Sequence, residues 1–201
     1  MVLTPSRMVR LGAKAPDFTL NDVVTGQPVH LSSFADKKAL LVMFICRHCP
    51  YVQHIKHELS RLDKDYRGKD IAMVAISSND IQNYPDDAPE NLRALAIEQD
   101  WHFPFLFDST QGVAKKYMAA CTPDFFLYSQ SNSGDPGDVP VLVYRGQLDD
   151  SRPGNGKPVT GKDLREAMDA VLTGKPVPKL QHPGIGCNIK WKKGNEPDYF
   201  K

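Results

Sequence analysis

The feature that most constrains the fold is a short apolar run that leads directly into two closely spaced cysteines. Residues 39–45 (ALLVMFI) are all apolar, which is typical of a strand buried on both faces. Cys46 and Cys49 follow, with Pro50 next. Apolar side chains then recur at helical spacing, at Val52, Ile55, Leu59, Leu62 and Tyr66. The sequence therefore predicts a strand, a cysteine-bearing turn and a helix in direct succession, with Cys49 at the helix start.

The same alternation of apolar runs and amphipathic stretches continues along the chain. It is the pattern expected when helices cover both faces of a sheet, so we predict an α/β fold. A turn at 25–28 places an N-terminal hairpin at a sheet edge, and Ser109 is a candidate helix cap. The further strands are predicted at 17–20, 29–31, 71–77, 103–108, 124–128 and 139–144, and the further helices at 89–99, 109–117 and 161–172.

The last part of the chain has a different composition. From residue 174 the sequence loses its periodicity and gathers prolines and glycines, which is typical of an extended segment. We predict one domain at 1–173 and a C-terminal extension at 174–201. Because the extension carries Ile185, Trp191 and other apolar residues, we expect it to pack on the domain or on a partner subunit. Residues 131–138 (SNSGDPGD) are predicted to form a loop insertion.

Charge and hydropathy exclude several classes of function. The chain has 25 Lys and Arg against 24 Asp and Glu, a net charge of +1, so binding to nucleic acid or to an anionic membrane is not indicated. The sequence has no secretory apolar core near its start and no run long enough to span a bilayer, and we expect a cytoplasmic location. No glycine-rich phosphate loop follows a strand, so we expect no nucleotide cofactor.

The cysteines carry the candidate chemistry. The chain has four, Cys46, Cys49, Cys121 and Cys187, too few for a disulfide scaffold at this size. Amides and the dipole at a helix start stabilise a thiolate at Cys49. Arg47 and His48 are candidates to lower its pKa further. A Cys-x-x-Cys after a strand is a redox signal, and a Cys46–Cys49 disulfide is feasible in a tight turn.

The cysteines allow at least three interpretations. As a disulfide oxidoreductase, the chain would attack a partner's disulfide with Cys49 and release it with Cys46, which requires Cys46 at or near the surface. As a metal protein, it would use Cys46, His48, Cys49 and perhaps Cys121, but no second short-spaced pair closes a tetrahedron, so we expect no metal. As a binding module, its cysteines would be incidental.

A second motif completes a resemblance to a known family. Thr122-Pro123 follows Cys121 and precedes an apolar strand, and Pro123 is a candidate for a cis peptide bond. Hairpin, strand, cysteine turn, helix and Thr-Pro together resemble the thioredoxin-like superfamily, with its central mixed sheet. More narrowly, residues 12–172 resemble an uncharacterised peroxiredoxin-like subgroup of the alkyl hydroperoxide reductase and thiol-specific antioxidant (AhpC/TSA) family. The segments that carry this likeness are 12–18, 48–52, 121–126 and 184–188.

The resemblance implies roles for individual residues. Cys49 aligns with the family's first active-site cysteine, which implies that it is the attacking thiolate. Thr122 and Pro123 would form a wall beside the substrate, and Cys121 would face the same site. The chain departs from the family pattern at Val42, where a proline is usual, and at Cys46, where peroxiredoxins carry a threonine. Arg47 and Arg145 are the candidates for the peroxidase's partner arginine.

The implied activity is an antioxidant, peroxiredoxin-like peroxidase. Its substrate would be a peroxide or a disulfide, its reductant a small thiol or a thioredoxin-type protein, and its assembly a homo-oligomer. A second thiol would condense with the oxidised Cys49. By their distance along the sequence we expect this resolving thiol to be Cys46, Cys121 or Cys187, in that order.

Overall fold

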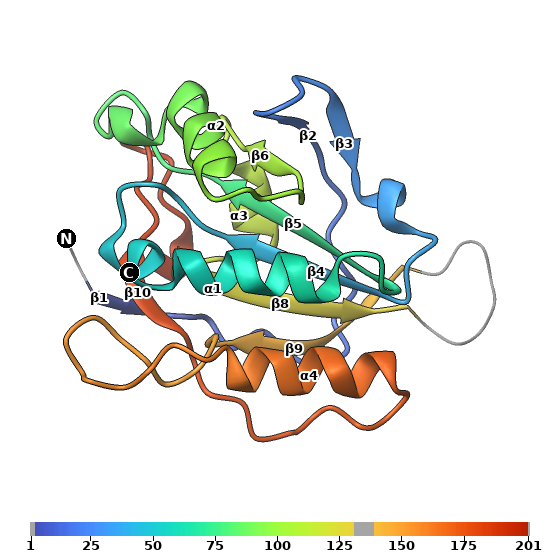
Figure 1. Cartoon of the computed structure of the whole chain (residues 1–201). Helices are drawn as coiled ribbons and strands as arrows, with labels where there is room; N and C mark the ends of the chain where they lie inside the picture. The colour runs from blue at the N-terminus through green and yellow to red at the C-terminus, as the bar shows by residue number, and fades with distance from the viewer. Residues whose placement is uncertain (1–2, 131–138, 201) are drawn as a thin grey trace.

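A central mixed sheet organises the chain. The computed structural model describes residues 3–130 and 139–200 (Figure 1), and the predicted loop insertion at 131–138 lies outside them. The strand order is β3-β2-β6-β5-β4-β8-β9, with β4 parallel to β5 and antiparallel to β8. The strands are β2 (Thr19–Asp22), β3 (Pro28–His30), β4 (Ala39–Phe44), β5 (Ile71–Ser77), β6 (Phe105–Phe107), β8 (Asp124–Ser129) and β9 (Val141–Gly146). The predicted N-terminal hairpin, β2 and β3, lies at one edge.

Helices cover both faces of the sheet, as Figure 1 shows. The helices are α1 (Pro50–Tyr66), α2 (Pro89–Glu98), α3 (Gly112–Lys116) and α4 (Lys162–Leu172), and the 3-10 turns are η1 (Leu31–Phe34), η2 (Pro85–Asp87) and η3 (Asp198–Phe200). Successive residues of β4 point to opposite faces. Leu41 packs in one apolar cluster with α1 and α4, and Leu40 in another with α3. This explains why the whole of β4 is buried.

The helix predicted at 109–117 is shorter than expected, and the prediction of Ser109 as its cap is wrong. The helix begins at Gly112, and Gln111 is its N-cap in the left-handed region, with φ 62°. Other side chains satisfy the first turn: an Asp108 carboxylate oxygen accepts the Ala114 N–H at 3.0 Å, and Thr110 Oγ1 accepts the Gly112 N–H at 3.2 Å.

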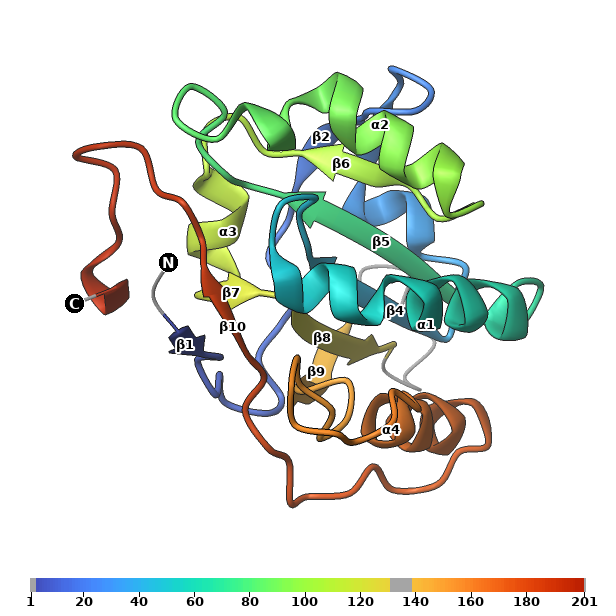
Figure 2. The same cartoon turned by 60° about the vertical axis from the view of Figure 1, so that its left-hand side comes forward.

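A second, small sheet joins the two ends of the chain. Its order is β1 (Leu3–Pro5), β10 (Ile185–Asn188) and β7 (Cys121–Thr122), and both pairs are antiparallel. Figure 2 shows β10 passing beside β7 and β1. A Cβ on Gly186 would lie only 2.1 Å from the Thr122 carbonyl oxygen, so the absence of a side chain permits this close approach. None of the helices in the described part of the chain is long and apolar enough to cross a membrane.

Candidate active site

Cys49 lies where the first central strand gives way to a helix. It is the N-cap of α1, with Pro50 in the first turn, as the apolar run and the helical spacing predicted. Proline is favoured there because N–H groups in the first turn have no acceptor within the helix, so proline, which lacks an N–H, loses no hydrogen bond. The Cys49 side chain is fully buried, so the thiol lies beneath the surface at the positive end of the helix dipole.

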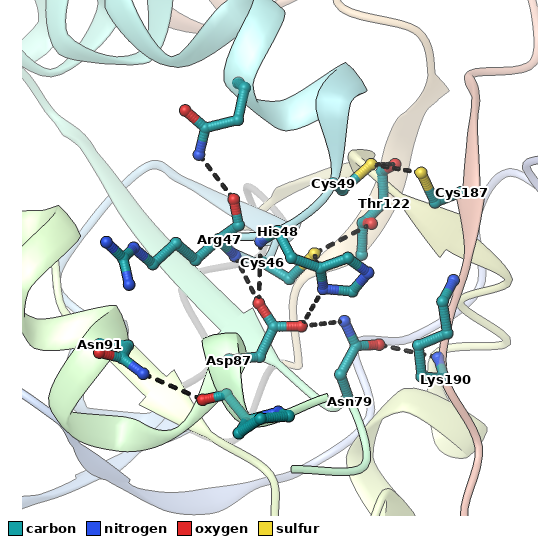
Figure 3. Close-up of polar contacts among 12 residues, drawn as sticks. Cys46, Arg47, His48, Cys49, Asn79, Asp87, Asn91, Thr122, Cys187 and Lys190 are labelled. Carbon is teal, nitrogen blue, oxygen red and sulfur yellow. Dashed lines mark hydrogen bonds and ion pairs between the residues drawn. The ribbon is translucent and has the colours of Figure 1, made fainter. Parts of the chain in front are cut away.

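The sulfur atom of Cys187 lies beside that of Cys49. The two sulfur atoms are 2.8 Å apart (Figure 3), and none of the four cysteines is in a disulfide. Cys187 reaches this place because β10 pairs with β7 in a register that sets it opposite Thr122. The Cys49 sulfur is also 3.1 Å from the Thr122 carbonyl oxygen. The candidate expected last from sequence distance is therefore in direct contact with Cys49.

The other two cysteines have different surroundings. The Cys46 sulfur lies 3.4 Å from Thr122 Oγ1, so Cys46 and Cys49 both contact Thr122. It is fully buried, so the surface position that disulfide exchange with a protein would require is not observed. The Cys121 sulfur instead lies 3.9 Å from Ser6 Oγ and 3.7 Å from the Pro123 carbonyl oxygen.

The peptide bond between Thr122 and Pro123 is cis, in agreement with the sequence. The carbonyl group of this peptide bond belongs to Thr122 and contacts the Cys49 sulfur. Thr122 is buried. The Thr-Pro motif and the cysteine turn, more than 70 positions apart in the chain, thus meet at the same end of the sheet.

Hydrogen bonding selects one thiolate among these cysteines. Interactions with the thiols of Cys187 and Cys46, in that order, hold the pKa of Cys49 well below its ordinary value, against the effect of burial. Burial, followed by the hydrogen bond to Cys49, raises the pKa of Cys46. The bond to Cys49 and then burial raise the pKa of Cys187. Burial is the main reason that the pKa of Cys121 is raised. The negative charge therefore resides on Cys49, and its neighbours remain thiols.

This distribution predicts the pH dependence of the thiolate. Because the pKa of Cys49 is lowered, its thiolate should persist at pH values well below about 8.5, where an ordinary cysteine is protonated. The check is the ultraviolet thiolate absorbance of the reduced protein minus that of Cys49→Ser, recorded across pH. Absorbance that appears only as the pH rises through about 8.5 would contradict the assignment.

Asp87 organises the backbone of the cysteine turn. Its Oδ1 accepts the N–H groups of Arg47 at 2.8 Å and of His48 at 3.1 Å. Its Oδ2 accepts from Asn79 Nδ2 at 2.7 Å and from His48 Nδ1 at 2.5 Å (Figure 3). Burial raises the pKa of Asp87, but the hydrogen bonds from His48 and Asn79 lower it more, so the net shift is downward. The carboxylate thus fixes both the turn and the orientation of the His48 ring, which stacks on Tyr84.

The sequence did not identify Asp87 or Asn79 as site residues. Asp87 lies in η2, outside the cysteine turn. Its distance of 40 positions from Arg47 explains why the sequence did not identify it. A buried carboxylate that binds a distant turn leaves no periodic or local signal.

Asp87→Ala should reduce the free energy of unfolding by about 3 kcal/mol, because it leaves buried donors without their charged acceptor. Asp86→Ala is the matched control, since Asp86 is the exposed neighbour in η2 and should change stability by no more than about 0.5 kcal/mol. Urea unfolding followed by circular dichroism measures both. Equal stability of the two variants would contradict the role assigned to Asp87.

Neither arginine singled out from the sequence points toward the sulfur atoms. The Arg47 side chain extends away from the cysteines (Figure 3). Arg145 lies on β9, where Nε donates to the Val9 carbonyl at 2.8 Å and Nη1 donates to Gln181 Oε1 at 2.6 Å. The lowered pKa of Cys49 is accounted for by neighbouring thiols, Thr122 and the backbone at Val52.

Three potential metal ligands gather at the same turn. Within the described ranges, Cys46, His48 and Asp87 bring ligand atoms within 4.8 Å of one another. Both carboxylate oxygens of Asp87 already accept two hydrogen bonds each, and His48 Nδ1 serves one of them. The set has three members, whereas structural zinc sites have four. We therefore assign the cluster to hydrogen bonding.

Comparisons with known proteins agree with this architecture. The model of the AhpC/TSA family matches residues 11–133. An uncharacterized conserved protein from Geobacillus kaustophilus has 51% sequence identity over 96% of this chain and 97% of its own, with a TM-score of 0.89. A hypothetical protein from Sinorhizobium meliloti has 49% identity over 94% and 98%, with a TM-score of 0.88. No curated protein matches the sequence.

A more distant structure confirms the fold alone. The thioredoxin domain of a thiol-disulfide oxidoreductase from Bacteroides vulgatus has 21% identity over 69% of this chain and 91% of its own, with a TM-score of 0.52. The predicted thioredoxin-like arrangement, a mixed sheet flanked by helices, is thereby confirmed.

Proposed function

The chain belongs to the AhpC/TSA family, and from this we propose that it is a thiol peroxidase in which Cys49 attacks a hydroperoxide and Cys187 resolves the product. Membership supports a thiol-based redox function. The observation that carries the finer proposal is the contact of 2.8 Å between the sulfur atoms of Cys49 and Cys187. Cys187 would therefore have two roles: it would stabilise the attacking thiolate of Cys49, and it would then react with the sulfenic acid that forms on Cys49.

The first step oxidises Cys49 and reduces the peroxide. The thiolate attacks one peroxide oxygen, the O–O bond breaks, and Cys49 becomes a sulfenic acid. The departing alkoxide or hydroxide takes a proton and leaves as alcohol or water. The lowered pKa of Cys49 supports this step, because the thiolate is the nucleophile.

The second step joins the two sulfur atoms. Cys187 attacks the sulfur of the sulfenic acid, a disulfide forms, and the hydroxyl group leaves as water with the Cys187 proton. Reducing equivalents would then come from a small dithiol or a thioredoxin-type protein, in the cytoplasm, where thiols are kept reduced.

Burial favours a hydroperoxide over a protein disulfide as the oxidant. All four cysteines are buried, and β10 lies over Cys49. A disulfide on a folded partner would need β10 to move before any sulfur could be attacked. A hydroperoxide presents only two oxygen atoms and needs far less room.

The test is a stopped-flow mixture of the reduced protein with hydrogen peroxide, in which peroxide loss is followed over time. We expect consumption much faster than that by free cysteine at the same pH. Cys121→Ser is the control, because Cys121 contacts Ser6 and Pro123 rather than the reacting pair, and it should react like the wild type. Peroxide loss no faster than with free cysteine would overturn the proposal.

A further inference from the structure

Cys49 has two thiol neighbours, and they come from different parts of the chain. Cys187 belongs to β10, in the C-terminal extension, whereas Cys46 belongs to the turn that precedes α1. The Cys187 sulfur lies 2.8 Å from that of Cys49. The Cys46 and Cys49 sulfur atoms both lie against Thr122, at 3.4 Å from its Oγ1 and 3.1 Å from its carbonyl oxygen respectively. A disulfide at Cys49 can therefore be made with either partner, and the two disulfides have different consequences for the rest of the molecule.

A disulfide between Cys49 and Cys187 would fasten the extension over the site. β10 is already held between β1 and β7, and Cys187 lies opposite Thr122 in that register. A covalent bond to α1 would add a tether at the same point. Because Cys49 and Cys187 are both buried, a bulky reductant would have no access to the bond.

We propose that Cys46 transfers the disulfide: its sulfur attacks the Cys49 sulfur of the Cys49–Cys187 disulfide, a Cys46–Cys49 disulfide forms, and Cys187 leaves as a thiol. The inference depends on the proposed function for the origin of the first disulfide. The exchange breaks one S–S bond and makes another, and the proton lost by Cys46 passes to the departing Cys187 sulfur, so no outside oxidant is needed. The transfer releases β10 from α1 and makes the new disulfide accessible once the strand lifts.

The surroundings of Cys46 suit it for attack only after Cys49 has been oxidised. In the reduced protein, burial, the interaction with Cys49 and the charge of Asp87 keep the pKa of Cys46 high, and the charge of the Cys49 thiolate adds to them. Both contributions of Cys49 end when it enters a disulfide, whereas burial and Asp87 remain. The Thr122 hydroxyl, 3.4 Å from the Cys46 sulfur, then remains as a hydrogen-bond donor to it. His48 Nδ1 lies 3.9 Å from the same sulfur, but its hydrogen is donated to the Asp87 carboxylate.

The departing thiol is also assisted. The interaction with Cys49 and burial raise the pKa of Cys187, and the charge of Lys190 acts against this rise; a more acidic thiol leaves faster in disulfide exchange. Lys190 lies two residues after the end of β10. Its Nζ donates hydrogen bonds to the backbone and side-chain oxygens of Asn188, the last residue of that strand. The same segment therefore carries both the leaving sulfur and the charge that favours its departure.

The test follows the order of the disulfides. The reduced protein is oxidised with one equivalent of hydrogen peroxide or, separately, of diamide, quenched in acid at intervals, and mapped by mass spectrometry. We expect Cys49–Cys187 first and Cys46–Cys49 later. Cys46→Ser should stop at Cys49–Cys187, and a thioredoxin-type reductant should reduce it at least about tenfold more slowly than the wild type. Cys121→Ser should behave as the wild type.

The two oxidants distinguish this inference from the proposed function. Disulfide transfer with diamide, without any rapid reaction with peroxide, would overturn the peroxidase and retain the transfer. A wild type that keeps only Cys49–Cys187, with Cys46→Ser reduced at the same rate, would overturn the transfer and retain the peroxidase. A first disulfide other than Cys49–Cys187 in the diamide arm would also overturn the transfer.

Discussion

Cys49→Ser is expected to slow peroxide consumption by roughly a thousandfold or more, because it removes the nucleophile itself. The serine hydroxyl has no lowered pKa comparable with that of the thiol, and it cannot form the sulfenic acid on which the second step depends. The serine is close in size to cysteine, so the buried N-cap position should tolerate it. Stopped-flow measurement of peroxide loss, with each variant at the same concentration, gives the ratio.

The control for this variant is Cys121→Ser, which makes the same chemical change at another buried cysteine. It should keep the wild-type rate, since Cys121 lies toward Ser6 and the Pro123 carbonyl. Retention of fast peroxide loss in Cys49→Ser would show that another cysteine is the nucleophile.

Cys187→Ser is expected to separate the two steps. The first oxidation should proceed at close to the wild-type rate, because the serine hydroxyl can still donate a hydrogen bond to the Cys49 sulfur. The sulfenic acid should then persist, and its labelling by dimedone should rise by about tenfold, because the thiol at 2.8 Å has been removed. Turnover with a dithiol reductant should fall by a similar factor.

One outcome would contradict the resolving role of Cys187, and another would contradict only the expected tolerance of the serine. Unchanged turnover, with no gain in dimedone labelling, would assign the resolving step to Cys46. Loss of the first oxidation itself would show that the serine hydroxyl does not replace the Cys187 thiol in stabilising the Cys49 thiolate. Leu180→Ala, a change at a residue of the extension that is 80% exposed, controls for disturbance of that segment and should leave both steps intact.

The central part of the fold was predictable because its signals are local. The apolar run of β4, the helical spacing after Pro50 and the apolar run of β5 each lie within one element, and each element was found where the sequence placed it. Cys49 at the start of a helix follows from the same local pattern. The Thr-Pro motif was informative because a peptide bond that precedes proline has only a weak preference for trans.

The contacts around the sulfur atoms depend on distant pairings and were less predictable. Cys187 is 138 positions from Cys49, and only the register of β10 on β7 brings them together. Gly186 was the available signal, since a glycine within a strand often marks a close backbone approach. Asp87 had no signal of that kind, because its role is to accept hydrogen bonds from a turn 40 positions away.

The measurement that tests the central claim most directly is the identity of the first disulfide formed when the reduced protein meets one equivalent of hydrogen peroxide. The sample is quenched within milliseconds and mapped by mass spectrometry beside Cys49→Ser. We predict a bond between Cys49 and Cys187, formed as the peroxide disappears and absent from the variant. Peroxide that remains unconsumed, or a first bond that does not include Cys49, would contradict the account.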